Sequence, residues 1–161
     1  MLTGYWMAED PFESLSHTPI ASPFGDAGVF LHGLCGIFAI ALHEIFGYEL
    51  SWVLDDLEDD EEDGDFDPWR HLVHIYCEAE SGDEDAYIDV RGITTDEETF
   101  FDEFRDFFTE GSFGYGLPVD TIRDRIIEDM SEEEYAAAYE IAKELIHKNE
   151  SYYKTEKESY A

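Results

Sequence analysis

The longest apolar stretch of the chain runs from residue 29 to residue 42, and the segment from residue 33 to residue 46 is apolar on nearly every helical face. Such a segment predicts a helix in the centre of the fold, because a helix on the surface would keep one polar face. Gly47 follows at once and is a typical residue for the C-terminal cap of this helix. Residues 48–54 then indicate a short strand.

Two β-rich runs, 71–78 and 86–91, lie on either side of Ser81 and Gly82 and predict a β-hairpin. After the hairpin, residues 95–98 match a capping box at the start of a helix. That helix would carry a one-sided stripe of phenylalanines, which we interpret as core rather than as a cofactor site: Phe100, Phe101, Phe104, Phe107 and Phe108.

Two more helices are predicted near the C-terminus. Residues 120–129 place Ile122, Ile126 and Ile127 on one face, and Ser131 caps a helix that runs to about residue 148. The element order predicts an α+β fold, with a central cysteine-bearing helix packed on a small antiparallel sheet and with helices at the C-terminus. We expect one domain over residues 1–149, with its core at 30–108, and a polar, frayed tail over 150–161.

The charge of the chain is extreme: 41 acidic residues stand against 9 lysines and arginines, which gives a net charge of −32 over 161 residues. Because 43% of the residues are hydrophobic, the chain can still build a core, and the acids must lie on its surface. This charge argues against direct binding to nucleic-acid phosphates or to an anionic membrane. It favours a protein partner with a basic surface.

The acidic residues are locally unopposed in the first part of the chain. No lysine or arginine precedes Arg70, and residues 55–67 contain 10 acids in 13 positions. We predict a surface loop there that serves as an acidic binding face, made of Asp55, Asp56, Glu58, Asp59, Asp60, Glu61, Glu62, Asp63, Asp65 and Asp67. A solvated charge run, as on proteins of halophiles, would give the same pattern.

Metal motifs are incomplete in this sequence. His43 and Glu44 would need a histidine at position 47 to form a zinc-protease motif, and that position is Gly47. In the acidic loop an EF-hand would place its closing glutamate at Arg70. We therefore expect no resident metal and no cofactor, and at most loose binding of divalent ions at the loop.

Compartment signals are also few. The two cysteines, Cys35 and Cys77, are too few for a disulfide scaffold, and the first ten residues lack the basic segment of a signal peptide. The longest apolar segment is too short to cross a bilayer. We expect a cytoplasmic protein.

The strongest candidate for chemistry is Cys35, in the first turn of the central helix. The amides and the dipole at a helix N-terminus favour a thiolate, and the Cys35 amide could contribute to an oxyanion hole. A cysteine nucleophile needs a general base and an orienting carboxylate, which His74 and Asp89 could provide from the two hairpin strands. In isolation, a cysteine in so apolar a segment is also typical of a buried core position.

The expected hairpin register supports this trio. A turn centred on Ser81 and Gly82 places His74 directly opposite Asp89 with both side chains on one face. Cys77 then points to the other face, and His71, the rival base, points away from Asp89.

The residues at 33–43, 74–76 and 87–94 resemble the papain-like cysteine peptidases, in particular small bacterial and phage proteins of that group. The shared features are a Gly-x-Cys helix, a histidine strand and an Asp-x-Arg-Gly strand followed by a helix. The resemblance spans about residues 30–108 and implies Cys35 as nucleophile, His74 as base and Asp89 as orienting residue, with Arg91 and Gly92 shaping the turn beneath them.

The chain departs from that pattern before Cys35, where no glutamine or asparagine completes an oxyanion hole and His32 or a backbone group would have to serve. The resemblance implies a thiol hydrolase that acts on a protein or peptide amide. The alternative is a nucleic-acid mimic without catalysis, of the phage anti-restriction or anti-CRISPR type, whose carboxylates imitate phosphates and bind a basic nucleic-acid enzyme.

Overall fold

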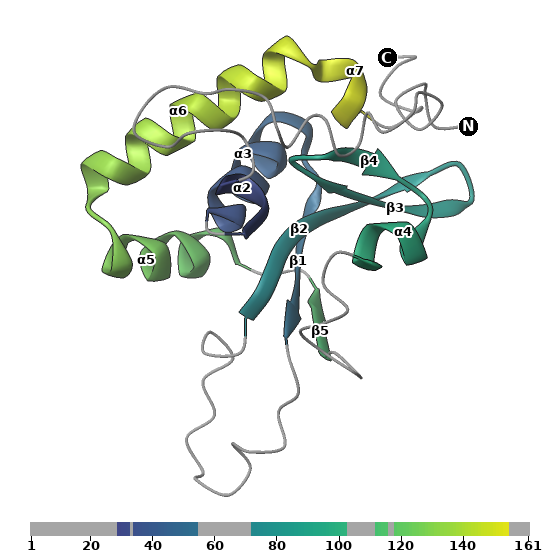
Figure 1. Ribbon diagram of the computed structural model, residues 1–161, viewed down its shortest axis with the longest axis horizontal. Helices are drawn as coiled ribbons and strands as arrows, with labels where there is room; N and C mark the ends of the chain where they lie inside the picture. The colour runs from purple at the N-terminus through teal and green to yellow at the C-terminus, as the bar shows by residue number, and fades with distance from the viewer. Residues whose placement is uncertain (1–28, 33, 55–71, 103–111, 116–117, 155–161) are drawn as a thin grey trace, which may run out of the picture.

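The computed structural model describes residues 29–32, 34–54, 72–102, 112–115 and 118–154. These residues form an α+β fold around a five-stranded antiparallel sheet with the strand order β4-β3-β2-β1-β5 (Figure 1). The strands are β1 (Glu49–Leu54), β2 (Leu72–Ser81), β3 (Glu84–Asp89), β4 (Gly92–Thr94) and β5 (Ser112–Tyr115). The helices are α2 (Val29–His32), α3 (Cys35–Phe46), α4 (Glu97–Asp102), α5 (Val119–Asp129), α6 (Glu132–Lys148) and α7 (Glu150–Tyr153).

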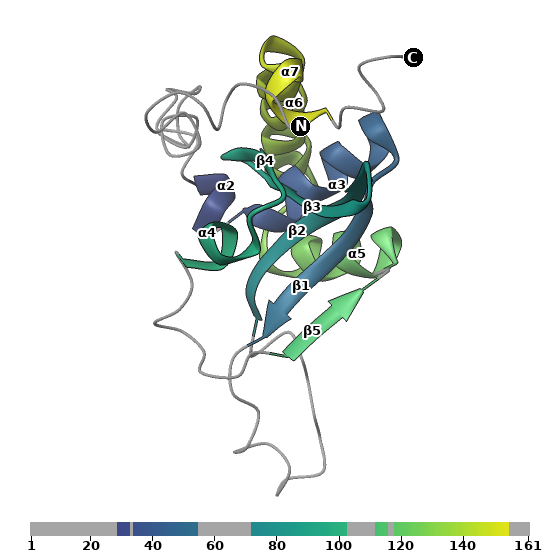
Figure 2. The same cartoon turned by 90° about the vertical axis from the view of Figure 1, so that its right-hand side faces the viewer.

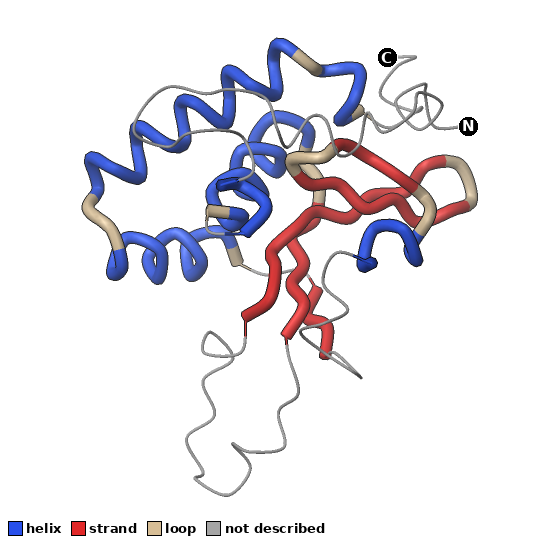
Figure 3. The backbone as a smooth tube through the Cα atoms, viewed as in Figure 1, coloured by secondary structure: helices blue, strands red, loops and turns tan. Residues whose placement is uncertain are grey.

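Helices lie on both faces of the sheet, but unequally. Figure 3 shows α3, α5 and α6 on one side of the strands and α4 on the other. The side chains of β2 explain this division: Cys77 contacts the backbone of α3, while its neighbour Tyr76 packs against Phe100 and Phe101 of α4. The turned view shows β1 between β2 and β5 (Figure 2).

The predicted central helix is confirmed as α3, whose first eight residues are all buried. It ends at Gly47, which has a left-handed φ of 80° and donates its amide to the carbonyl of His43 at 2.8 Å. A side chain on Gly36 would come within 2.8 Å of Ile126 Cδ1 in α5 and 3.1 Å of Ile75 Cδ1 in β2. The first turn of α3 is therefore enclosed between the sheet and α5.

The hairpin forms as predicted, but its expected register is wrong. Ser81 pairs with Glu84, so the turn consists of Gly82 and Asp83 rather than Ser81 and Gly82. The physical reason is that Gly82 has a φ of 67°, a left-handed conformation that the turn needs and that glycine adopts at least cost. His74 is consequently two residues away from the position opposite Asp89, and an even shift leaves both side chains on the same face.

The helix after the hairpin starts one residue later than the capping box predicted. Asp96 is its cap, because one carboxylate oxygen accepts the Thr99 amide at 3.2 Å and the other accepts the Thr99 hydroxyl at 2.7 Å. Of the predicted phenylalanine stripe, Phe100 and Phe101 are buried as core. The side chains of Phe104, Phe107 and Phe108 lie outside the described residues.

The C-terminal helices follow the predicted pattern. Ser131 caps α6 by accepting the Glu134 amide at 3.1 Å. One face of this helix is buried: Tyr135, Ala138, Ala142, Leu145 and Ile146. In α5, Ile122 is buried and Ile126 and Ile127 are partly buried against the core.

The tail differs from the prediction. Residues 150–153 form α7, and Tyr153 is completely buried instead of frayed. Its ring packs against Phe38, and its carbonyl accepts the hydroxyl of Tyr48 at 2.7 Å. A tyrosine in a polar segment can thus extend the packed part of the chain to residue 153. Among the described residues, no helix has both the length and the apolar character to cross a membrane.

The observed register predicts that position 82 requires a left-handed backbone. Nothing lies within 4 Å of a side chain added at Gly82, so a substitution there tests backbone conformation alone. We expect Gly82→Ala to lower the free energy of unfolding by about 1 kcal/mol, and Gly82→Asn to lower it by less, because asparagine tolerates this conformation. Urea unfolding of both variants measures the difference. Equal stability of the Ala variant and the wild type would contradict the register.

Candidate functional site

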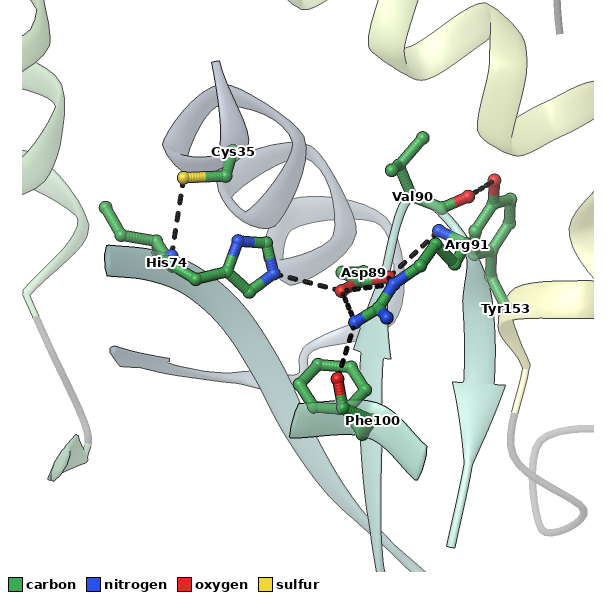
Figure 4. Close-up of polar contacts among 8 residues, drawn as sticks. Cys35, His74, Asp89, Val90, Arg91, Phe100 and Tyr153 are labelled. Carbon is green, nitrogen blue, oxygen red and sulfur yellow. Dashed lines mark hydrogen bonds and ion pairs between the residues drawn. The ribbon is translucent and has the colours of Figure 1, made fainter. Parts of the chain in front are cut away.

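The structure brings Cys35, His74 and Asp89 together (Figure 4). Cys35 is the first residue of α3, where helix amides lack partners within the helix. Its sulfur accepts the backbone amide of Ile75 at 3.3 Å. The amide of a neighbouring strand thus holds the sulfur in place.

His74 lies between the thiol and the carboxylate. Its Nε2 forms a 2.9 Å hydrogen bond with Asp89 Oδ2, and Figure 4 shows the ring between that carboxylate and the side chain of Cys35. The exposed fractions are 6% for Cys35, 0% for His74 and 3% for Asp89. The trio is therefore almost completely enclosed by protein, where electrostatic interactions are stronger than in water.

Arg91 holds Asp89 in place from the opposite side to His74. Its Nη2 donates to Asp89 Oδ2 at 2.7 Å, its Nε to Oδ1 at 3.1 Å, and its backbone amide to Oδ1 at 2.9 Å. Nη2 also donates to the carbonyl of Phe100 at 3.0 Å, and the guanidinium lies 4.8 Å from the centre of the Phe100 ring. Because Arg91 is itself buried, one cation neutralises one buried carboxylate with several charge-assisted hydrogen bonds.

These contacts shift the pKa values of Asp89 and His74. Burial acts to raise the pKa of Asp89, but the charge of Arg91 and the hydrogen bond with His74 outweigh it and hold that pKa well below its usual range. Burial acts to lower the pKa of His74, but the interactions with Asp89 and Cys35 raise it above 6.5. An ionised Asp89 therefore makes His74 a stronger base, as a group that withdraws a proton from a thiol must be.

Cys77 is separate from this site, as predicted. Its thiol donates to the Ala39 carbonyl of α3 at 3.3 Å and is fully buried. Burial raises the pKa of Cys77 well above its ordinary value. Cys77 is therefore a core residue.

Other predicted residues lie outside the description of the structure. These are His71, the side chain of His32 and the entire acidic loop, from Asp55 to Asp67. His43 and Glu44 are described and serve structural roles: His43 Nδ1 pairs with the carbonyl of Tyr48 at 2.6 Å, and Glu44 contacts Arg123 and Tyr139. Within the described part of the chain, no group of three or more His, Cys, Asp or Glu side chains is placed to hold a metal ion.

Two contacts of the site were not predicted. The resemblance assigned Arg91 to the turn, but not to the direct ion pair with Asp89, and no pattern pointed to the Ile75 amide as a donor to sulfur. The opposite charges of Asp89 and Arg91, two residues apart, could have indicated the first contact, although the structure places Arg91 in the turn after β3 and not on the strand. The second depends on how α3 docks on β2, which no local signal encodes.

Comparison with known proteins gives no relative for the chain. No protein-family model, curated protein or solved structure matches it significantly. The chemical interpretation of the site therefore depends on its geometry: a thiol at a helix N-terminus, an adjacent imidazole and a carboxylate that orients the imidazole.

The raised pKa of His74 predicts a pH-dependent contribution to stability. A group with a raised pKa in the folded state stabilises the fold most at pH values below its unfolded pKa, here 6.5, and loses that contribution as the pH rises through the folded value. We expect His74→Gln to cost more unfolding free energy at about pH 5.5 than at about pH 9, because only the protonated imidazole gains from the charges of Asp89 and Cys35. Urea unfolding at the two pH values measures the difference. An equal loss of unfolding free energy at both pH values would contradict a raised pKa of His74.

Proposed function

We propose that this protein is a papain-like thiol hydrolase that cleaves a protein or peptide amide with Cys35 as nucleophile. The observation that carries the proposal is the placement of Cys35, the first residue of α3, beside the hydrogen-bonded pair of His74 and Asp89 (Figure 4). The Ile75 amide holds the sulfur on one side of this group, and Arg91 holds the carboxylate on the other. A buried cysteine of the core, such as Cys77, has no need of an imidazole or a paired carboxylate. The proposal is also supported by the elements that carry the three residues: Cys35 starts a buried helix, and His74 and Asp89 lie on adjacent strands.

The reaction would proceed in two steps. In the first, His74 holds the proton of Cys35, the sulfur forms a bond to the substrate carbonyl carbon, and the amide C–N bond breaks as His74 delivers the proton to the leaving nitrogen. In the second, water attacks the thioester, His74 takes a proton from the water and returns it to the sulfur, and the acid is released. Amides in the first turn of α3 are suited to stabilise the oxygen anion in both steps.

The charge of the chain limits the substrate. A net charge of −32 repels anionic peptides and attracts cationic ones, and this effect weakens with salt. We therefore propose that the substrate carries lysine or arginine near the cleaved bond.

Thiol alkylation tests the catalytic assignment. We expect iodoacetamide at about pH 7 to modify Cys35 at least tenfold faster than the same thiol in the unfolded chain, because His74 and the helix N-terminus favour the thiolate. Peptide mapping by mass spectrometry identifies the modified residue. Cys77→Ala is the matched control and should leave the rate unchanged, and His74→Gln should slow it. A folded-state rate no faster than the unfolded one would reject the proposal.

A second function is favoured by a separate observation. The tip of the β2–β3 hairpin and the start of α4 expose a group of acids: Glu80, Asp83, Glu84, Asp85, Asp96, Glu97 and Glu98. Arg91 is the one lysine or arginine between residues 72 and 102, and it is buried against Asp89. On α6, by contrast, Lys143 and Lys148 pair with Glu140 and Glu144. We propose that the hairpin tip, together with the acidic loop at 55–67, binds a nucleic-acid enzyme with a basic surface.

Charge reversal tests this alternative. We expect the lysine variant of Glu80, Asp83, Glu84 and Asp85 to weaken binding to a restriction endonuclease or a Cas nuclease at least tenfold, because it reverses the charge of an exposed acidic patch. Binding of the wild type should also fall steeply between about 50 and 300 mM salt. The control reverses Glu140 and Glu144, whose charges are already paired, and should have a smaller effect. An affinity that does not change with salt, or an equal loss of affinity in both variants, would contradict the proposal that the acidic surface mimics nucleic acid.

A further inference from the structure

The C-terminal helix α7 covers the turn that joins β3 to β4. Tyr153, the last residue of α7, is completely buried and donates its hydroxyl to the carbonyl of Val90 at 2.8 Å (Figure 4). Val90 lies between Asp89 and Arg91 in the sequence. A residue 63 positions away along the chain thus contacts the backbone of the proposed site.

Tyr153 is itself held from two sides. Its ring packs on Phe38 of α3, with ring centres 5.5 Å apart, and its carbonyl accepts the hydroxyl of Tyr48 at 2.7 Å. Phe38 and Tyr48 are both buried. The hydroxyl of Tyr153 is therefore fixed by the same helix that begins at Cys35.

The contact with Val90 acts on Asp89 through one peptide group. The carbonyl of Val90 and the amide of Arg91 belong to the same peptide bond, which is planar. Tyr153 donates to the oxygen of this group, and the N–H of the group donates to Asp89 Oδ1 at 2.9 Å. Fixing the oxygen fixes the direction of the N–H, and a hydrogen bond to the carbonyl also strengthens the amide as a donor.

We propose that Tyr153 is a positioning residue of the site, which holds the Val90–Arg91 peptide so that Asp89 stays aligned with His74. This inference deepens the proposed thiol hydrolase function and rests on it. It makes the C-terminal helix part of the catalytic apparatus, although no residue of α7 touches the thiol among the contacts described.

The titration of His74 tests the role of Tyr153. Tyr153→Phe removes only the hydroxyl, so the ring can still pack on Phe38. We expect the pKa of His74, measured by NMR of the imidazole, to fall by about 0.5 or more in this variant, because a looser Asp89 stabilises the imidazolium less. A purely structural role for the hydroxyl would lower the melting temperature without moving this pKa.

The matched control is Tyr135→Phe. The hydroxyl of Tyr135, also a buried tyrosine, accepts a hydrogen bond from Arg123 Nε at 3.4 Å, away from the site. We expect the pKa of His74 to be unchanged in this variant. An unchanged pKa in Tyr153→Phe, or an equal fall in Tyr135→Phe, would overturn the inference.

A second variant covers the case in which Tyr153→Phe does not fold. Tyr48→Phe leaves the Tyr153 hydroxyl in place but removes the hydrogen bond to its carbonyl, and we expect a smaller fall in the same direction. An unchanged pKa of His74 in Tyr48→Phe would then overturn the inference. This measurement is independent of catalysis: unreactive Cys35 in the wild type would reject the proposed function, while the titration of His74 would still report whether Tyr153 positions Asp89.

Discussion

The ion pair between Asp89 and Arg91 is the interaction on which the site depends. A carboxylate that is 3% exposed would ordinarily take up a proton, because burial disfavours its charge. Arg91 keeps it ionised through two guanidinium donors and one amide donor, and only an ionised Asp89 can raise the basicity of His74. The same arginine reaches the Phe100 carbonyl and so ties α4 to the strand that carries Asp89. Removing one partner of such a pair would leave an uncompensated buried charge.

Much of this arrangement could be predicted from the sequence. The fold class and α3 were predictable because a segment that is apolar on all faces and ends at Gly47 is typical of a buried helix and of few other structures. The grouping of His74 with Asp89 was predictable because strand residues with even offsets share a face, and it survived a wrong register for that reason. The register itself was ambiguous, since serine and glycine are both common in turns, and the left-handed backbone at Gly82 decided it.

The supporting contacts could not be predicted, because they are non-local. The donation from the Ile75 amide to Cys35 depends on the docking of a helix against a strand 40 residues away. The buried position of Tyr153 depends on contacts with Tyr48, Phe38 and Val90, which lie far from it and from one another in the sequence. A polar segment with isolated tyrosines carries no periodic signal, so local patterns indicated a frayed tail. Among the described residues, Asp89 is the one buried carboxylate, and the buried Arg91 neutralises it.

We propose Cys35 as a nucleophile that His74 activates toward cationic substrates. The most direct test is covalent capture by a lysine chloromethyl ketone, a cationic electrophile that alkylates activated thiols, followed by intact-mass analysis and peptide mapping. We predict a single adduct on Cys35 in the wild type. The adduct should form more slowly in His74→Gln, and salt should slow its formation further. An absent adduct, or one that forms equally fast without His74, would contradict it.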